Sequence, residues 1–111
     1  MISIQEYVSE EDENPFRKWF DGLDPQAAAM VTVAIGRLGD GNTSNVKSIG
    51  DGAAELRIDR GPGYRVYFGW DGKVLVILLG GGTKRRQQYD IAAALLRWRD
   101  YKRRKRDAKK G

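Results

Sequence analysis

The stretch from residue 55 to residue 90 combines cationic and phenolic side chains with two turn sequences and three consecutive glycines. Guanidinium groups bind phosphate oxygens through paired hydrogen bonds, and aromatic rings stack on unpaired bases. Side chains of these types on one surface suit a phosphodiester ligand. The residues concerned are Arg57, Arg65, Tyr67, Lys84, Arg86 and Tyr89.

Two segments of this stretch, 54–59 and 64–70, alternate apolar and polar side chains as antiparallel strands do. The connection between them decides the register. A three-residue loop at 61–63, where glycine accepts a positive φ, places Ile58 opposite Val66 and keeps the apolar side chains on one face. A two-residue loop mixes the two faces. We therefore expect the three-residue loop.

Under this register Arg57 lies opposite Tyr67, and Asp59 lies opposite Arg65. We expect an apolar face that packs on helices and a polar face that carries both arginines and Tyr67. A phosphate is one partner for such arginines. The alternative is that the arginines are solvated or are paired with Glu55 and Asp59.

The second turn sequence follows the strand at 64–70. Residues 71–72, Asp-Gly, predict a two-residue hairpin turn that pairs Trp70 with Lys73. Residues 74–79 are apolar at every position, so this strand is expected to be central or covered on both faces. The glycines at 80–82 are expected to let the backbone leave the sheet.

Helices are predicted before and after these strands. A helix N-cap followed by proline occurs at residues 14–15 and again at 24–25, and each begins a segment with apolar side chains at helical spacing. Residues 40–52 are expected to be a polar loop. A last helix begins near Gln87, and we expect it to fray beyond Tyr101, where apolar residues end.

Together with a short strand around Ile2 and Ile4, these elements predict an α+β fold. An N-terminal strand and a helical hairpin pack on a small antiparallel sheet, and a C-terminal helix follows. The length of 111 residues fits one domain. We assign that domain to residues 1–101 and a basic C-terminal tail to residues 102–111.

The chain contains neither cysteine nor histidine. Disulfides, thiolate metal sites and the commonest general base are therefore excluded, and we expect no metal and no cofactor. The first residues lack the basic and apolar regions of a signal peptide, and no apolar run approaches the roughly 20 residues that span a bilayer. We expect a soluble cytoplasmic protein without a membrane partner.

The net charge of +5 is unevenly distributed along the chain. Residues 97–110 contain nine Lys or Arg against two Asp, whereas residues 1–24 are acidic. The basic end favours a polyanionic partner, with Arg97, Arg103 and Arg104 as candidate RNA contacts. A solvated tail is the equal alternative.

The run ELRIDRGPGYRVYF, the apolar strand and the run GGGTKRRQQYDI together resemble the RelE/ParE toxin superfamily, in its HigB-like, phage-derived branch of addiction module killer proteins. The resemblance covers residues 14–100 and the order of elements. It implies the toxin of a type II toxin–antitoxin pair. Most RelE-like members are metal-independent endoribonucleases that cut mRNA on the ribosome: the 2′-OH attacks the adjacent phosphate and leaves a 2′,3′-cyclic phosphate and a 5′-OH.

The resemblance also implies roles for single residues. Arg65 matches the strand arginine that neutralises the scissile phosphate, and Arg57 matches the arginine that supports it. Lys84 is the candidate for proton transfer, and Asp90 orients that lysine or caps the last helix. Tyr89 is a candidate for base stacking or proton transfer. The other expected RNA contacts are Arg86, Tyr67, Arg97, Arg103 and Arg104.

Three functions stay open at this level. An mRNA endonuclease leads, because Arg65 and Lys84 are expected on one face, a convergence that a toxin acting only by binding does not need. The alternatives are a ParE-like inhibitor of DNA gyrase and a non-catalytic member that binds its antitoxin. The expected partners are mRNA, the ribosome and an antitoxin, typically a small helix-turn-helix protein encoded next to the toxin.

Overall fold

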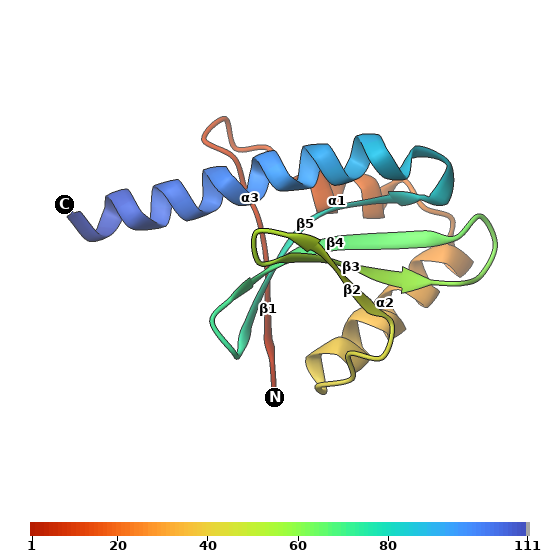
Figure 1. Cartoon of the computed structure of the whole chain (residues 1–111). Coiled ribbons are helices and arrows are strands. Elements are labelled where there is room, and N and C mark those ends of the chain that lie inside the picture. Colours follow the sequence, from red (N-terminus) through yellow and green to blue (C-terminus); the bar gives the residue numbers. More distant parts are fainter. Residues whose placement is uncertain (111) are drawn as a thin grey trace.

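The computed structural model of the chain describes residues 1–110, and it places one five-stranded sheet between helices (Figure 1). The expected α+β class is confirmed. The strands are β1 (Ser3–Glu6), β2 (Val46–Gly50), β3 (Ala53–Ile58), β4 (Tyr64–Asp71) and β5 (Leu75–Thr83). The helices are α1 (Pro15–Asp21), α2 (Pro25–Gly39) and α3 (Gln87–Lys110), and a short 3-10 helix, η1 (Lys84–Arg86), precedes α3.

The strand order in the sheet is β1-β5-β4-β3-β2. β1 pairs with β5 in parallel, and all other neighbours are antiparallel. β5 therefore lies inside the sheet, as its apolar sequence predicts. β1 accompanies only the first part of β5, from Leu75 to Leu78. The later residues of β5 lie beyond the end of β1.

Both predicted N-caps are confirmed. The Asn14 side chain accepts a hydrogen bond of 3.0 Å from the Arg17 backbone N–H, and Asp24 does the same for Ala27 at 3.0 Å. A proline opens each helix, where its missing N–H costs nothing. The apolar side chains of α1 and α2 then pack together on one face of the sheet, with Phe16, Val31 and Leu38 among the most buried.

The opposite face of the sheet is covered by α3, which contradicts the expectation of an open polar face (Figure 1). Tyr67, Ile77 and Leu79 form a second core there with Ala94 and Trp98 of α3. Burial of a phenol and two aliphatic side chains against the helix outweighs the polarity of the neighbouring arginines. The arginines consequently lie under a helix.

The register of β3 and β4 differs from the prediction by two residues. Arg57 lies opposite Arg65, and Ile58 lies opposite Tyr64, so the connection holds residues 59–63 and is not a three-residue loop. A shift of two residues preserves the faces. The prediction that Arg57 and Arg65 share a face is therefore confirmed, whereas the predicted pairing of Arg57 with Tyr67 is wrong.

The predicted two-residue turn between β4 and β5 is also wrong. Asp71 pairs with Leu75, and Trp70 pairs with Val76 where Lys73 was expected. The three connecting residues include Gly72, whose φ of +73° suits the left-handed position of such a loop. This longer loop sets apolar side chains of both strands on the face that α1 and α2 cover.

The three glycines at 80–82 remain in β5, contrary to the expectation that they leave the sheet. Glycine is needed at these positions because side chains of other elements occupy the space that a Cβ would take. A Cβ at Gly81 would overlap the Trp19 ring of α1, and a Cβ at Gly82 would overlap the Asp90 carboxyl of α3. Glycine inside a strand thus permits close approach from both layers.

One strand was not predicted. Residues 40–52 were expected to be a loop, but they contain β2, which pairs with β3. Its sequence, VKSIG, is short and polar, and the pairing is irregular between Ser48 and Gly50. Local sequence preference for a strand is weak here, so β2 depends on its hydrogen bonds to β3.

Candidate functional site

A buried group of charged side chains lies between β3, β4 and the start of α3. Glu55 and Arg65 are 1% and 3% exposed, and Arg65 Nε lies 3.4 Å from Glu55 Oε2. Arg65 also donates a hydrogen bond of 3.0 Å from Nη1 to the Gly63 carbonyl. Arg57 Nε lies 3.7 Å from the other carboxylate oxygen of Glu55, and the Arg57 side chain stays 40% exposed.

Gln87, the first residue of α3, connects this buried charged group to the helix. Its Nε2 donates to both carboxylate oxygens of Glu55, at 3.3 and 3.1 Å. In this arrangement Arg65 pairs with Glu55, as the ion-pair alternative anticipated, and its guanidinium is not accessible to a phosphate. Arg65 therefore contributes to the contact between the sheet and α3 through Glu55, to which Gln87 bonds.

Tyr67 belongs to the second core and is 1% exposed. Burial raises its pKa to about 12, and the nearby carboxylates of Glu55 and Asp90 contribute in the same direction. Its hydroxyl has no hydrogen-bond partner within residues 1–110. The phenol therefore stays neutral at physiological pH and is not displayed for stacking on a base.

A groove of about 750 Å³ opens between α1, β5 and α3. Gly80 and Gly81 of β5 form part of its floor, beyond the end of β1. Lys18 and Trp19 of α1 line one side. The α3 side is lined by Tyr89, Asp90, Ala93 and Arg97. Three of the predicted site residues, Tyr89, Asp90 and Arg97, thus lie together in one groove.

The spacing of these residues along α3 explains why they share the groove. Asp90, Ala93 and Arg97 follow one another at intervals of three and four residues, so they lie on one stripe of the helix. Arg97 Nη1 donates a hydrogen bond of 3.1 Å to the Leu79 carbonyl, which fixes the guanidinium against β5. A Cβ at Gly80 would lie 2.8 Å from that nitrogen.

Asp90 is a titratable residue of the groove whose pKa is shifted. Burial raises its pKa, and the charges of Arg86 and Arg97 partly oppose that shift. Within residues 1–110 Asp90 forms no ion pair, so the predicted pairing with Lys84 is not seen, and no cluster of side chains suited to a metal ion is found. A carboxyl with raised pKa is suited to proton transfer.

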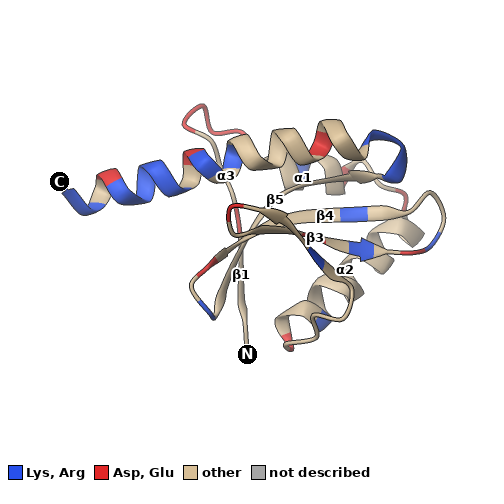
Figure 2. Ribbon diagram, viewed as in Figure 1, with Lys and Arg blue, Asp and Glu red and all other residues tan. Residues whose placement is uncertain are grey.

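Lys84 and Arg86 lie on η1 at the edge of the site, and both are exposed. The Lys84 backbone N–H donates to the Gly63 carbonyl at 2.9 Å, which ties η1 to the β3–β4 connection. The Arg86 guanidinium lies 4.7 Å from the centre of the Tyr89 ring. Figure 2 shows a cationic turn before α3 and further cations along the C-terminal half of α3, separated by residues 87–96, which include no Lys or Arg.

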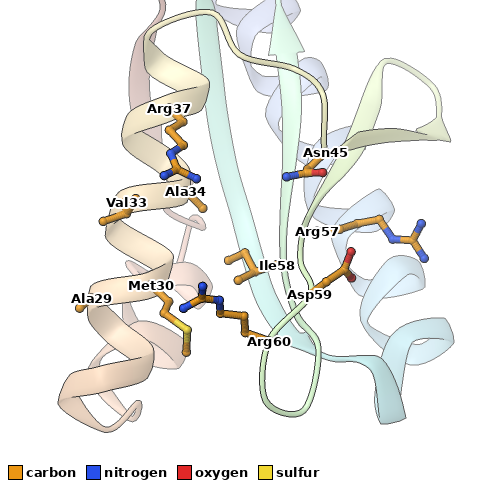
Figure 3. A pocket seen from close by; sticks show the side chains of 10 residues that line it. All are labelled: Ala29, Met30, Val33, Ala34, Arg37, Asn45, Arg57, Ile58, Asp59 and Arg60. Atoms are coloured by element: carbon orange, nitrogen blue, oxygen red, sulfur yellow. The ribbon is translucent and has the colours of Figure 1, made fainter.

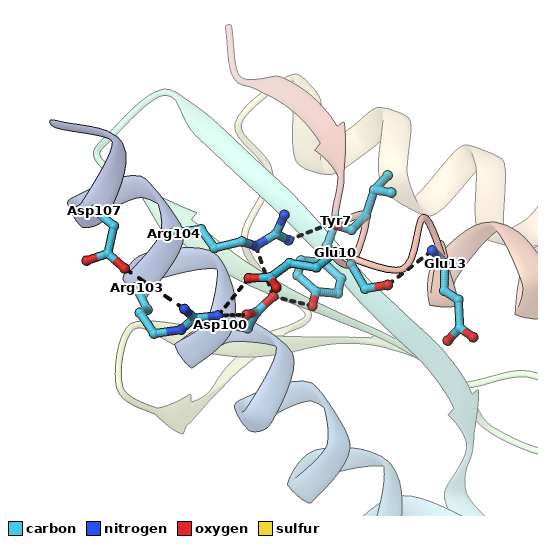
Figure 4. A network of polar contacts seen from close by, with 9 residues as sticks. Tyr7, Glu10, Glu13, Asp100, Arg103, Arg104 and Asp107 are labelled. Atoms are coloured by element: carbon cyan, nitrogen blue, oxygen red, sulfur yellow. Dashed lines mark hydrogen bonds and ion pairs between the residues drawn. The ribbon is translucent and has the colours of Figure 1, made fainter. Parts of the chain in front are cut away.

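Two predicted RNA contacts in the basic C-terminal segment are engaged with acidic groups of the chain itself (Figure 4). Arg103 pairs with Asp100 at 2.6 Å and with Glu10 at 3.0 Å. Arg104 pairs with Asp100 at 3.1 Å and donates to the Val8 carbonyl. These contacts attach the acidic N-terminal segment to α3, which continues as a helix to Lys110 where fraying was expected.

Sequence reasoning named Glu55 only as an alternative partner of the arginines, and it missed other residues of these sites. Lys18 and Trp19 carried no signal, since both occur in a helix whose apolar pattern accounts for Trp19 as a core residue. Gln87 likewise showed no feature that distinguishes it from an ordinary first residue of a helix.

Residues 18–99 match the profile of the family described as "Phage derived protein Gp49-like (DUF891)". The chain belongs to this Gp49-like family. The Gp49-like family is of the RelE/ParE-like toxin type, so the expected superfamily is confirmed at this level. Among known proteins, an uncharacterized protein from Haemophilus influenzae is 48% identical over 82 residues, which cover 73% of this chain and 83% of that relative. Within residues 1–110, no helix is both long enough and apolar enough to cross a bilayer.

Proposed function

We propose that this Gp49-like protein is the toxin of a HigB-like type II toxin–antitoxin pair and that it cleaves mRNA without a metal ion. The observation that carries the proposal is the groove between α1, β5 and α3. It combines two aromatic side chains, Trp19 and Tyr89, with two cations, Lys18 and Arg97, around Asp90. Aromatic rings and cations together suit single-stranded RNA.

In this proposal Asp90 accepts the proton of the ribose 2′-OH. The 2′-oxygen then forms a bond to phosphorus, the bond from phosphorus to the 5′-oxygen breaks, and the 5′-oxygen takes up a proton from water. The products are a 2′,3′-cyclic phosphate and a 5′-OH. Lys18 and Arg97 compensate the charge that develops on the phosphate, and Lys84 and Arg86 contact the flanking backbone.

Arg65 and Arg57 have a different role here from the one the resemblance implies. Because Arg65 is buried against Glu55, and Gln87 of α3 bonds to the same carboxylate, we assign Arg65 as a positioning residue that supports the start of α3 through Glu55. Arg57 supports it from the exposed side of the same carboxylate. Tyr89, which is 67% exposed, is free to stack on a base.

Primer extension on translated mRNA tests the proposal. Asp90→Asn keeps the size of the side chain and removes the proton acceptor, so cleavage should slow by about 100-fold or more. Lys18→Gln should weaken RNA binding and lower the slope of log K against log salt concentration by about 0.7. Asp40→Asn, at the far end of α2, is the matched control and should cleave normally.

Two outcomes contradict the proposal. Undiminished cleavage by Asp90→Asn removes Asp90 from the chemistry. Inhibition of DNA supercoiling by a wild-type chain that cuts no RNA selects the gyrase-inhibitor alternative.

The rate of RNA cleavage by the wild type should also fall as the pH drops through the raised pKa of Asp90, because only the ionised carboxylate accepts a proton.

A further inference from the structure

A second recess, which we call the α2 cleft, lies beside α2 on the face of the sheet opposite α3 (Figure 1). The groove between α1, β5 and α3 is called the RNA groove below. The α2 cleft has a volume of about 430 Å³ and separates α2 from the end of β3 (Figure 3). Met30 and Val33 of α2 and Ile58 of β3 form its apolar part. Arg37 and Arg60 line it from α2 and from the β3–β4 connection.

The two arginines of the α2 cleft are not used by the fold. Neither Arg37 nor Arg60 forms an ion pair within residues 1–110. In Figure 3 both side chains lie in the space beside α2, whereas the Arg57 guanidinium points away from it. Arg57 instead approaches Glu55. Asp59 also lines the cleft, but it pairs with neither arginine, so the cleft carries a net positive charge.

The apolar part of the cleft is accessible. Val33 is 53% exposed, although Val31, two residues earlier on the same helix, is fully buried. Met30 is half-buried at the edge of the same surface, and Ala34 lies between this surface and the core. Helix α2 thus presents Met30 and Val33 outside the core that its Val31 and Leu38 complete. An apolar helix side flanked by cations is typical of a surface that binds a partner.

No strand covers this corner of the sheet within the described residues. The Arg57 N–H donates to the Asn45 carbonyl at 2.9 Å, just before β2 begins, and β2 then pairs with β3 from Leu56 toward Ala53. Ile58 pairs only with Tyr64 of β4. The end of β3 beside α2 is consequently left open.

We propose that the α2 cleft binds an acidic, amphipathic helical segment of the cognate antitoxin, an inference that rests on the toxin function proposed above. The stretch of α2 from Ala29 to Arg37 is about 12 Å long, which matches about two turns of a partner helix. Apolar side chains of that helix contact Met30 and Val33, and its Asp or Glu side chains pair with Arg37 and Arg60.

The composition of the cleft favours a protein over RNA. None of the described residues that line it is aromatic, so it has no ring on which a base could stack. The RNA groove, in contrast, contains Trp19 and Tyr89. The two recesses are lined by different residues, so an antitoxin segment in the α2 cleft leaves the groove open.

The test uses the full chain and, as the probe, the small protein encoded by the reading frame adjacent to it. Affinity is measured by titration calorimetry at several salt concentrations. The double variant Arg37→Glu with Arg60→Glu should weaken binding at least tenfold and reduce its salt dependence. Val33→Asp should also weaken binding at least tenfold. Lys73→Glu and Val74→Asp repeat these changes at the exposed β4–β5 turn and should bind as the wild type does.

Unchanged affinity of the cleft variants, or no binding of the probe to the wild type, overturns the proposal. So does a dimer of the chain alone that Val33→Asp dissociates, since a second copy then occupies the cleft. A loss of RNA binding in the arginine variants assigns the cleft to RNA. The variants should cleave mRNA at the wild-type rate when the probe is absent. A wild type that binds the probe through the cleft but cuts no RNA contradicts the enzymatic proposal alone.

Discussion

Arg65 Nε lies 3.4 Å from Glu55 Oε2 inside the molecule, where the two side chains are 3% and 1% exposed. The pair joins β3 to β4, and Gln87 extends it to α3. A buried ion pair contributes little net stability, because desolvation of the charges offsets their attraction. Its value here is geometric: it fixes the start of the helix that carries Tyr89 and Asp90.

Removal of one partner of this pair should be costly. Glu55→Ala leaves the Arg65 charge buried without compensation, and we expect the free energy of unfolding to fall by about 3–5 kcal/mol. Urea denaturation measures the loss, with Glu13→Ala, an exposed carboxylate, as the control. The variant with both Glu55→Ala and Arg65→Ala should lose less than the sum of the single variants, because the two residues interact. Additive losses would contradict the pairing.

Glycine at position 69 should be required by packing. A Cβ at Gly69 would overlap the Trp98 ring, which α3 lays across β4. We expect Gly69→Ala to lower the free energy of unfolding by about 1–3 kcal/mol or more. Gly36→Ala, in the last turn of α2, is a matched control, because no atom outside the neighbouring helix backbone lies within 4 Å of the added Cβ. It should stabilise the protein by about 0.5–1 kcal/mol through helix propensity. Equal effects of both changes would refute the close contact.

Acid should weaken the attachment of the N-terminal segment to α3. The Tyr7 hydroxyl donates a hydrogen bond of 2.6 Å to Asp100, and this bond, with the cations Arg103 and Arg104, lowers the pKa of Asp100. A carboxylate with a lowered pKa contributes stability above its unfolded-state pKa and loses it as the pH falls through the lowered value.

Thermal unfolding measured between pH 7 and pH 2 tests this contribution of Asp100. The melting temperature of the wild type should fall as Asp100 becomes protonated. Asp100→Asn should melt lower than the wild type at pH 7 and should show a smaller decrease toward pH 2. An Asp100→Asn profile parallel to that of the wild type would show that Asp100 does not contribute to the acid sensitivity.

The free cations of the C-terminal segment should contribute to RNA binding. Arg106, Lys109 and Lys110 form no ion pair within residues 1–110, unlike Arg103 and Arg104. Replacement of these three by Gln should reduce the slope of log K against log salt concentration by about 2, with little change in melting temperature. An unchanged slope assigns the segment to solvent.

A deletion of residues 102–111 should act differently from those three substitutions. It also removes Arg104, which contacts Asp100, and Lys105, which pairs with Asp71. We therefore expect the truncated chain to melt at a lower temperature as well as to bind RNA less tightly. Circular dichroism during heating measures the change in melting temperature, and an RNA titration below that temperature measures the change in binding.

Several features were determined by the sequence alone because they depend on neighbouring residues. The starts of α1 and α2 follow from Asn14 and Asp24, each a side chain that accepts a hydrogen bond from its own helix. The common face of Arg57 and Arg65 follows from the alternation of strand residues, and it survived a register error because that error was two residues.

Other features depend on contacts between segments that are distant in the sequence, and local sequence patterns do not predict them. Arg65 is buried on the sheet face that α3 covers, and the first residue of α3, Gln87, bonds to Glu55, the ion-pair partner of Arg65. The glycines of β5 are explained by Trp19 and Asp90, which come from two other elements. The groove lies where β5 continues beyond the end of β1, and α1 and α3 flank that part of β5. Local preference and alternation fix which way a side chain faces, but the element that packs over it decides whether that side chain meets solvent.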